Sequence, residues 1–296
     1  MRVLVIADME GISGIETVDA CAPGHPEYPG GQERLAAEVN VLAEAAFAAG
    51  ASSVSVIDWH AGGGNIEAHA LDARVRIVAE DLSSGYDVAF LIGFHAMAGT
   101  RPAFISHTMF RGLALEIDGR ATGELGLLSR WAGEWGLPVA LVAGDRAATR
   151  EAEEFLPETP TLTMKLAQSW DRADALPVER THAALRAEVA RTLGRPEGWR
   201  VYRPQTPVRF RLRPREGAEV AARLPWLTRE DGGWLSGELP QVKDLIDLID
   251  VLSALSGAEQ RAELLRRLRD DPVAGAALRR EEAAARERAA RENPWP

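Results

Sequence analysis

The stretch VLVIADMEGISG, residues 3–14, opens with five apolar residues and then changes abruptly to Asp8, Met9, Glu10 and Gly11. A continuous apolar run of this kind is typical of a strand that is buried on both faces of a parallel sheet. Asp8 and Glu10 are two residues apart, so in extended backbone their side chains share one face, with roughly 7 Å between their Cα atoms. Taken alone, the stretch fits a strand that ends in an exposed turn. Whether Asp8 and Glu10 have a role beyond this turn depends on which other residues could meet them.

Similar apolar segments alternate with helical patterns through the first half of the chain. The segments typical of strands are residues 3–7, 53–58, 75–78, 87–93, 113–118 and 138–144. Helical periodicity marks residues 32–50, which end on the candidate capping residue Gly50, and a segment that starts near Thr122. This alternation predicts an α/β fold in which a mostly parallel sheet is flanked by helices.

The pattern changes at about residue 150. Residues 181–194 have helical periodicity, residues 208–213 and 233–239 read as strands, and a helix follows them. Beyond residue 256 the chain is rich in Ala, Arg and Glu, with both signs of charge mixed at helical spacing, which is typical of solvated helices. We therefore predict an α/β domain over residues 1–150, a smaller α+β domain over 151–256 and a charged helical C-terminal extension over 257–296.

Composition argues against several classes of protein. The formal net charge of the 296 residues is −10, whereas a protein that binds duplex nucleic acid needs a basic surface. No apolar run approaches the ~20 residues of a membrane-spanning helix, and Asp8 and Glu10 interrupt the N-terminal run before it reaches signal-peptide length. Cys21 is the single cysteine, so no disulfide framework is available within the chain. We expect a soluble, cytoplasmic protein with no nucleic-acid or membrane partner.

Polar residues recur where the predicted strands end. Separately, each has an ordinary explanation as a turn residue, a loop histidine or a carboxylate that interacts with a helix dipole. However, ligands of open α/β sheets bind beyond the carboxyl ends of the strands, where these residues would meet. Three carboxylates and two imidazoles would be enough for two zinc ions with open positions for water. The residues at or near strand ends are Asp8, Glu10, His60, His95, His107 and Glu124.

The sequence resembles the M55 family of metallo-aminopeptidases. DMEG, residues 8–11, resembles the family's S-x-D-x-E-G signature, with Ala7 in place of the serine. Matching blocks follow in the family's order: DWH (58–60), GFHA (93–96), SHTM (106–109), GELGL (123–127) and VAGD (142–145). The resemblance is specific over residues 1–150, is traceable to about residue 256 and does not cover the extension.

The resemblance implies an enzyme with a binuclear zinc site. It implies that His107 is catalytic, either by moving a proton or by stabilising the oxyanion. It also implies a ring-shaped homo-oligomer, for which a decamer is the candidate. The expected activity is hydrolysis of N-terminal residues from short peptides, with D-amino-acid peptides as one candidate substrate class. The zinc ligands that the resemblance implies are Asp8, Glu10, His60, His95 and Glu124.

Two other functions fit parts of the pattern. A two-metal phosphoesterase would use a similar set of ligands, but the chain has no P-loop and no lysine-rich phosphate cradle. A non-catalytic protein that binds a small ligand is the second alternative. A dinucleotide ligand is disfavoured because no G-x-G-x-x-G motif follows the first strand.

Overall fold

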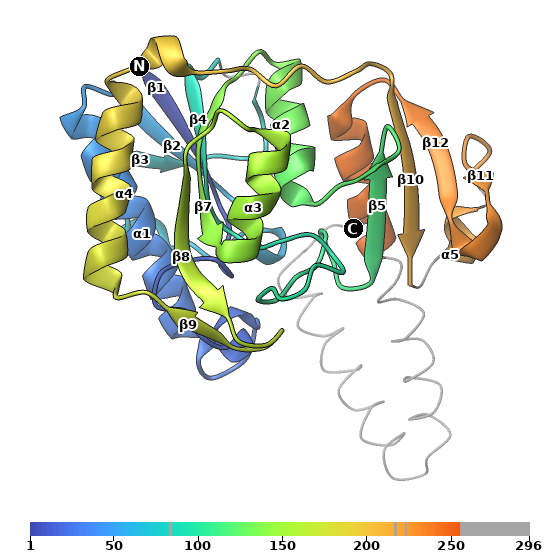
Figure 1. Cartoon of the computed structure of the whole chain (residues 1–296), viewed down its shortest axis with the longest axis horizontal. Helices are drawn as coiled ribbons and strands as arrows, with labels where there is room; N and C mark the ends of the chain where they lie inside the picture. Colours follow the sequence, from blue (N-terminus) through green and yellow to red (C-terminus); the bar gives the residue numbers. More distant parts are fainter. Residues whose placement is uncertain (83–84, 216–217, 223, 255–296) are drawn as a thin grey trace, which may run out of the picture.

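The computed structural model describes residues 1–82, 85–215, 218–222 and 224–254 (Figure 1). Its larger sheet has seven strands in the order β3-β2-β1-β4-β7-β8-β9. All neighbouring strands pair in parallel except β9, which is an antiparallel edge strand. The strands are β1 (Arg2–Ala7), β2 (Ser53–Asp58), β3 (Val75–Ile77), β4 (Val88–Phe94), β7 (Val139–Asp145), β8 (Thr161–Ala167) and β9 (Ala173–Ala175). The predicted fold class, a mostly parallel sheet flanked by helices, is confirmed.

Helices cover both faces of this sheet. Val3, Val5 and Ala7 of β1 pack with α1 (Tyr28–Ala48) and α4 (Val178–Leu193) in one apolar cluster. Leu4 and Ile6 point to the opposite face and belong to a second cluster. That cluster includes α2 (Glu124–Glu134), α3 (Arg146–Phe155) and the helix over residues 242–254. Because successive strand residues face opposite sides, burial on both sides explains the continuous apolar runs in the sequence.

A second sheet has five antiparallel strands in the order β11-β12-β10-β5-β6. Its strands are β5 (Leu113–Ile117), β6 (Arg120–Ala121), β10 (Val208–Pro214), β11 (Thr228–Arg229) and β12 (Leu235–Leu239). The helix over residues 242–254, orange in Figure 1, follows β12 and packs into the same apolar cluster as this sheet. This sheet and helix match the expected α+β part.

The chain passes between the two sheets more than once. The strand predicted at residues 113–118 belongs to the second sheet, where β5 pairs with β10 and forms a hairpin with β6 around Asp118 and Gly119. Its alternating burial is typical of a strand with one solvent-facing side, as in an antiparallel sheet. Conversely, β8 lies beyond residue 150 but belongs to the larger sheet. The sheets therefore do not divide at residue 150, and the expected domain boundary remains a prediction.

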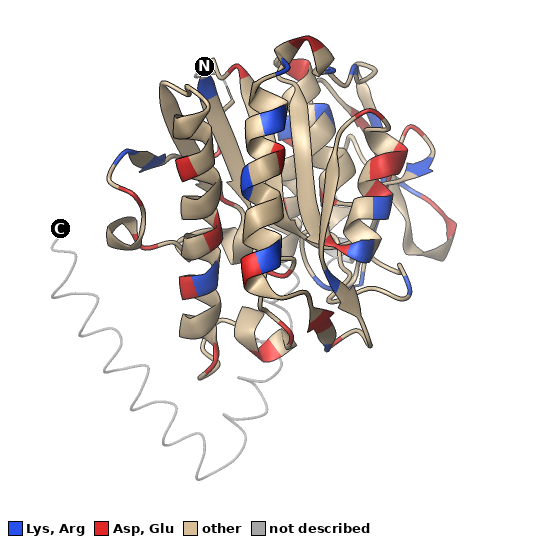
Figure 2. Cartoon of the chain, turned by 60° about the vertical axis from the view of Figure 1, so that its left-hand side comes forward, with Lys and Arg blue, Asp and Glu red and all other residues tan. Residues whose placement is uncertain are grey.

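Positions occupied by Lys, Arg, Asp and Glu recur along the helices that cover the larger sheet (Figure 2). Within the described residues, no helix combines the length and the apolar character needed to cross a bilayer. The predicted C-terminal extension over residues 257–296 lies outside the described residues. The short helices are α5 (Ala218–Ala221), η1 (Val18–Cys21), η2 (His60–Gly62), η3 (Ala68–Ala70), η4 (Pro196–Gly198) and η5 (Asp231–Gly233).

Candidate metal centre

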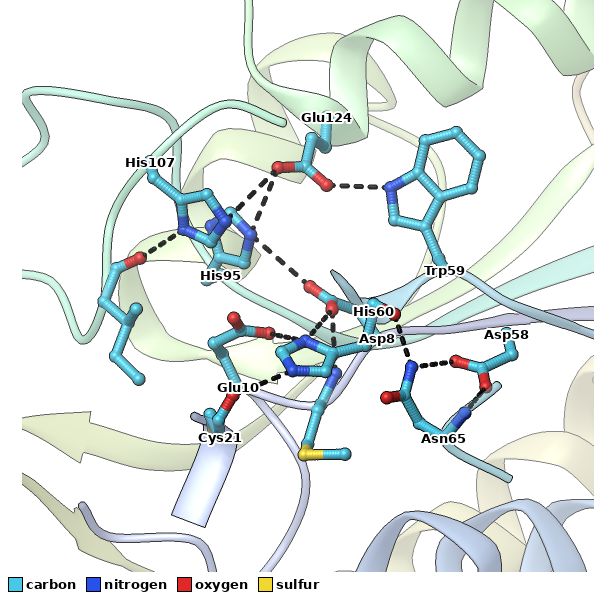
Figure 3. Close-up of polar contacts among 12 residues, drawn as sticks. Asp8, Glu10, Cys21, Asp58, Trp59, His60, Asn65, His95, His107 and Glu124 are labelled. Atoms are coloured by element: carbon cyan, nitrogen blue, oxygen red, sulfur yellow. Dashed lines mark hydrogen bonds and ion pairs between the residues drawn. The ribbon is translucent and has the colours of Figure 1, made fainter. Parts of the chain in front are cut away.

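Three adjacent strands bring their C-terminal residues to one place. In the order β2-β1-β4, Asp8 follows β1, His60 lies in η2 after β2, and His95 follows β4. Glu124 is the first residue of α2, and His107 lies on the loop that connects β4 to β5. The structure thus brings together all six side chains that the sequence singles out (Figure 3).

Glycine residues allow the ends of β1 and β4 to approach closely. Gly93 has a φ of +76°, and a Cβ atom there would lie 1.9 Å from the carbonyl oxygen of Asp8. The amide of Gly11 donates a hydrogen bond of 2.7 Å to the carbonyl of Gly93, which fixes the turn that carries Glu10. A larger residue at position 93 would push Asp8 away from His95.

The cluster has two halves that share Asp8. In the first half, Nδ1 of His60 lies 3.3 Å from Oδ1 of Asp8 and 3.0 Å from Oε2 of Glu10. In the second half, Nε2 of His95 lies 3.4 Å from Oδ2 of Asp8 and 3.3 Å from Oε1 of Glu124. All five residues are at most 5% exposed. Each half has the donor atoms of one cation site.

His107 stacks on the second half. Its ring lies 3.9 Å from the ring of His95, centroid to centroid, with an angle of 12° between the two planes. Nε2 of His107 is 3.9 Å from Oε1 of Glu124. His107 also lies close enough to Glu10 and His95 to form a third group that could hold an ion. Its position is therefore compatible with a ligand as well as with a group that acts on substrate.

Backbone carbonyls hold the outward-facing nitrogen of each imidazole. A ring N–H that donates to such a carbonyl leaves a lone pair on the other nitrogen, which faces the cluster. This is the tautomer that binds a metal or accepts a proton. The three contacts are His60 Nε2 with Cys21 O at 2.9 Å, His95 Nδ1 with Ala96 O at 3.0 Å, and His107 Nδ1 with Ile105 O at 2.7 Å.

Two supporting interactions were not predicted from the sequence. Trp59 donates its indole N–H to Oε2 of Glu124 at 2.7 Å and so holds that carboxylate in place. Asp58, two residues before His60, accepts hydrogen bonds from the amides of Asn65 and Ile66. Asn65 also donates to the carbonyl of His60, so Asp58 positions the loop while the carbonyl of Cys21 orients the ring.

The electrostatics of the cluster favour a cation. Burial and the adjacent Glu10 raise the pKa of Asp8 to about 8. Burial also opposes ionisation of Glu124, but the neighbouring His95 outweighs it and lowers the pKa of Glu124 to about 2. For His60, Glu10 and Asp8 outweigh burial and raise the pKa to about 12. Burial and the adjacent His95 lower the pKa of His107.

The donor set fits zinc. Oδ2 of Asp8 and Nε2 of His95 are buried and have no hydrogen-bond partner among the described residues. Unpartnered buried polar atoms are costly unless an ion or another group satisfies them. Imidazole nitrogens combined with carboxylate oxygens are ordinary zinc ligands. A separate group outside this cluster that could hold an ion, Asp19, His25 and Glu27, is mostly exposed and lacks this support.

A cavity of about 710 Å³ opens over the cluster. Asp8, Glu10, His60, His107 and Glu124 contribute to its wall. Its size suits a small ligand or a short peptide rather than a folded protein chain. The cluster is thus both buried and reachable from one side.

Comparison with known proteins identifies the family. Residues 1–251 match the family model of peptidase M55, described as D-aminopeptidase. The chain belongs to the M55 family. It is 34% identical over 175 residues to the D-aminopeptidase of Bacillus subtilis (strain 168), and the aligned part covers 56% of this chain. The match spans 64% of that relative's length, which is less than two thirds.

A solved structure has the same fold. It is described as the Zn-dependent D-aminopeptidase DppA from Bacillus subtilis, a self-compartmentalizing protease. The TM-score is 0.81 at 26% sequence identity, and the match covers 86% of this chain and 98% of the other. The predicted M55 membership is thereby confirmed.

Proposed function

We propose that this chain is a binuclear zinc aminopeptidase that removes N-terminal residues from short peptides, including peptides of D-amino acids. The observation that carries the proposal is the pair of buried half-sites that share Asp8 beneath one cavity. Membership of the M55 family and the Zn-dependent structural relative support both the metal and the reaction.

Each half-site would hold one ion. Asp8, Glu10 and His60 would hold the first, and Asp8, His95 and Glu124 the second. Bound zinc would act as a Lewis acid and would lower the pKa of a water ligand, supplying hydroxide near neutral pH. The chain's own residues orient the ligands through the indole of Trp59 and the carbonyls of Cys21 and Ala96.

His107 would move a proton at its Nε2 atom. Its Nδ1 atom is held by the carbonyl of Ile105, so only Nε2 is directed toward the cavity. Burial and His95 lower the pKa of His107, which favours the neutral ring that can accept a proton there. It can then return that proton to the leaving amine.

A phosphoesterase is the weaker alternative. Among the described residues that line the cavity, the carboxylates are Asp8, Glu10, Glu80, Glu124 and Asp250. Arg111 is the one lysine or arginine among them. Phosphate esters carry negative charge and are bound by clusters of basic groups, whereas these walls are acidic. The charge of the cavity therefore favours a peptide with a free amino group.

A hydrolysis screen of the whole chain tests the proposal. We expect the zinc-loaded protein to cleave dipeptides with free amino termini, tested as paired L- and D-peptides. N-acetylated dipeptides and a phosphate monoester should remain intact. Activity should disappear with chelator and return with zinc, at two ions per chain. Cleavage of the phosphate monoester alone, or equal cleavage of acetylated peptides, would contradict the proposal.

We further propose a ring-shaped homo-oligomer, for which a decamer is the candidate, located in the cytoplasm. The structural relative is described as self-compartmentalizing, which supports assembly. Trp135, Trp170 and Trp226 are 52%, 40% and 44% exposed, and tryptophan is enriched at protein interfaces.

If the sites face an enclosed chamber, substrate size is limited by its opening. We expect light scattering to give a mass several times that of one chain. We also expect the protein to cleave short peptides but leave the amino terminus of a folded protein intact. A monomer that trims a folded protein would contradict both expectations.

A further inference from the structure

The turn that carries Glu10 runs across the ends of two neighbouring strands. In the larger sheet, β4 and β7 separate β1 from β8. A Cβ atom on Gly11 would lie 2.3 Å from the carbonyl oxygen of Phe94 in β4 and 2.8 Å from the Cα atom of Gly144 in β7. The turn therefore passes directly over both strand ends, toward the part of the fold that β8 forms.

A buried lysine of β8 meets this turn. Nζ of Lys165 donates hydrogen bonds of 2.6 Å each to the carbonyls of Glu10 and Ile15. Lys165 is fully buried, and the ring of Phe104 adds a cation–π contact, with its centroid 5.1 Å from Nζ. Burial of an ammonium group is costly unless it is hydrogen-bonded, and hydrogen bonds from a charged donor are the strong ones. The ammonium group and the two carbonyls therefore hold one another in place.

Helix α1 holds the middle of the same turn. The amide of Ser13 donates a hydrogen bond of 2.9 Å to Oε2 of Glu38, and both residues are buried. The backbone of residues 10–15 is thus bound at both ends by the lysine and in the middle by a carboxyl group. The contact with Glu38 lies three residues from Glu10, whereas Lys165 binds the carbonyl of Glu10 itself. Lys165 is therefore the side chain placed to set the orientation of this candidate metal ligand.

Stability alone does not account for a charged side chain at this position. A buried charge with its partners is often no more stabilising than an apolar core of the same volume. Lys165 is also absent from the described residues that line the cavity, so a direct contact with substrate does not account for it. Its ammonium group instead binds the residue whose Oε2 atom lies 3.0 Å from Nδ1 of His60, in the first half of the metal centre.

We propose that Lys165 positions the first half-site: its ammonium group fixes the carbonyl of Glu10 and so directs the Glu10 carboxylate toward His60. The inference rests on the proposed function, because it assigns a residue that orients one of the proposed zinc ligands. Groups that orient metal ligands typically contribute about 10- to 100-fold to metal affinity. Lys165 acts in this way through the backbone, as Trp59 does through the side chain of Glu124.

Lys165→Met tests the inference through zinc affinity, measured by competition with a chelator of known affinity. Methionine keeps an unbranched buried side chain and removes the ammonium group. Two single-site backgrounds separate the halves, since His95→Ala leaves the first half-site intact and His60→Ala leaves the second. We expect Lys165→Met to weaken zinc binding by about 10- to 100-fold in the His95→Ala background and to leave it unchanged in the His60→Ala background.

The sign of the change separates positioning from a simple effect of charge. If Lys165 acted only through its charge, its removal should strengthen zinc binding, since like charges repel. Positioning predicts the opposite, a loss of affinity that is confined to the first half-site. Unchanged or tighter zinc binding by the His95→Ala, Lys165→Met variant would overturn the inference.

Thr149→Val is the matched control for a general loss of stability. Thr149 is buried on α3, and its hydroxyl lies 3.1 Å from the hydroxyl of Thr163, two residues before Lys165 on β8. This variant removes a buried hydrogen bond at the same strand without touching the turn, so it should keep wild-type zinc affinity in both backgrounds. An equal loss of affinity in this control would show a general effect of a weakened β8 and would also overturn the inference.

Lys165→Gln keeps the test decisive if the methionine variant does not fold. Glutamine is neutral and one bond shorter than lysine, but it retains a polar end for the buried carbonyls. It should show the same loss of zinc affinity in the first half-site, and wild-type affinity in this folded variant would contradict the inference.

The inference and the proposed function can fail separately. A wild type that binds two zinc ions but cleaves no free-amine dipeptide would contradict the aminopeptidase, while a loss of affinity confined to the first half-site in Lys165→Met would still support the role of Lys165. Conversely, an active wild type whose first half-site keeps its affinity in Lys165→Met would leave the aminopeptidase standing and remove Lys165 from the metal centre.

Discussion

Replacing Asp8 by asparagine is expected to prevent metal binding in both halves of the site and to abolish hydrolysis. Asp8 is the residue shared by the two half-sites, 3.3 Å from His60 and 3.4 Å from His95 through its two oxygens. Groups that only support metal ligands contribute about 10- to 100-fold to affinity, so loss of a shared ligand should cost more than about 100-fold. Zinc content and hydrolysis of a free-amine dipeptide measure the effect.

The variant should nevertheless fold. Asparagine has nearly the same shape as aspartate, so no void is created, and the repulsion between residue 8 and Glu10 is removed. The thermal midpoint of the metal-free variant should therefore equal or exceed that of the metal-free wild type. Zinc should raise the midpoint of the wild type only, because a ligand stabilises the state that binds it.

Asp19→Asn provides the control for loss of one acidic side chain. Asp19 belongs to the more exposed group with His25 and Glu27, the other place among the described residues where acids and a histidine could hold an ion. This variant should keep full zinc content and activity. If Asp19→Asn lost zinc while Asp8→Asn retained it, the metal centre would have to be reassigned.

The larger sheet could be predicted largely because its strands are buried on both faces. The apolar runs at residues 3–7, 53–58 and 87–93 correspond to β1, β2 and β4, which lie side by side in the structure. Since parallel strands carry their C-terminal ends to one edge, the polar residues that follow them could be expected to meet. Local sequence therefore indicated the positions of Asp8, His60 and His95 together.

Other features depend on contacts between residues far apart in the chain, which no local sequence pattern indicates. β8, with the sequence TLTMKLA, is only partly buried and includes Lys165, so it lacks the continuous apolar run of a central strand. Lys165 is nonetheless fully buried, because its ammonium group donates to the carbonyls of Glu10 and Ile15 at 2.6 Å each. β5 pairs with a strand about 95 residues later, as the contact between Glu116 and Arg211 illustrates.

The groups that hold the side chains of the metal centre in place could not be predicted from the sequence either. The carbonyls of Cys21 and Ile105 hold two of the imidazoles, but every residue has a carbonyl, so the sequence carries no sign of that role. Trp59 could have been noticed, since it precedes His60 in the DWH block. Its partner Glu124, however, is 65 residues away in the chain. Only the folded arrangement shows which acceptor the indole meets.

Replacing His107 by alanine should reduce turnover by about 10²-fold or more, the range typical of a group that transfers a proton, while both ions remain bound. Five other side chains supply the donor atoms of the two half-sites, so the metal does not require His107. The loop that carries His107 should keep its conformation, because hydrogen bonds from its backbone amides hold it in place. The amide of Ile105 donates to the carbonyl of Trp170 at 2.7 Å, and that of Met109 donates to Glu124 at 2.6 Å.

Ser106→Ala is the matched control on the same loop. Ser106 precedes His107 and its hydroxyl donates to the carbonyl of Thr100, but its side chain does not contribute to the described wall of the cavity. This variant should retain wild-type turnover and zinc. Wild-type turnover in His107→Ala would remove His107 from the reaction. Loss of one ion in His107→Ala would instead make it a ligand, as its proximity to Glu10 and His95 allows, so zinc content and turnover must be measured on the same preparation.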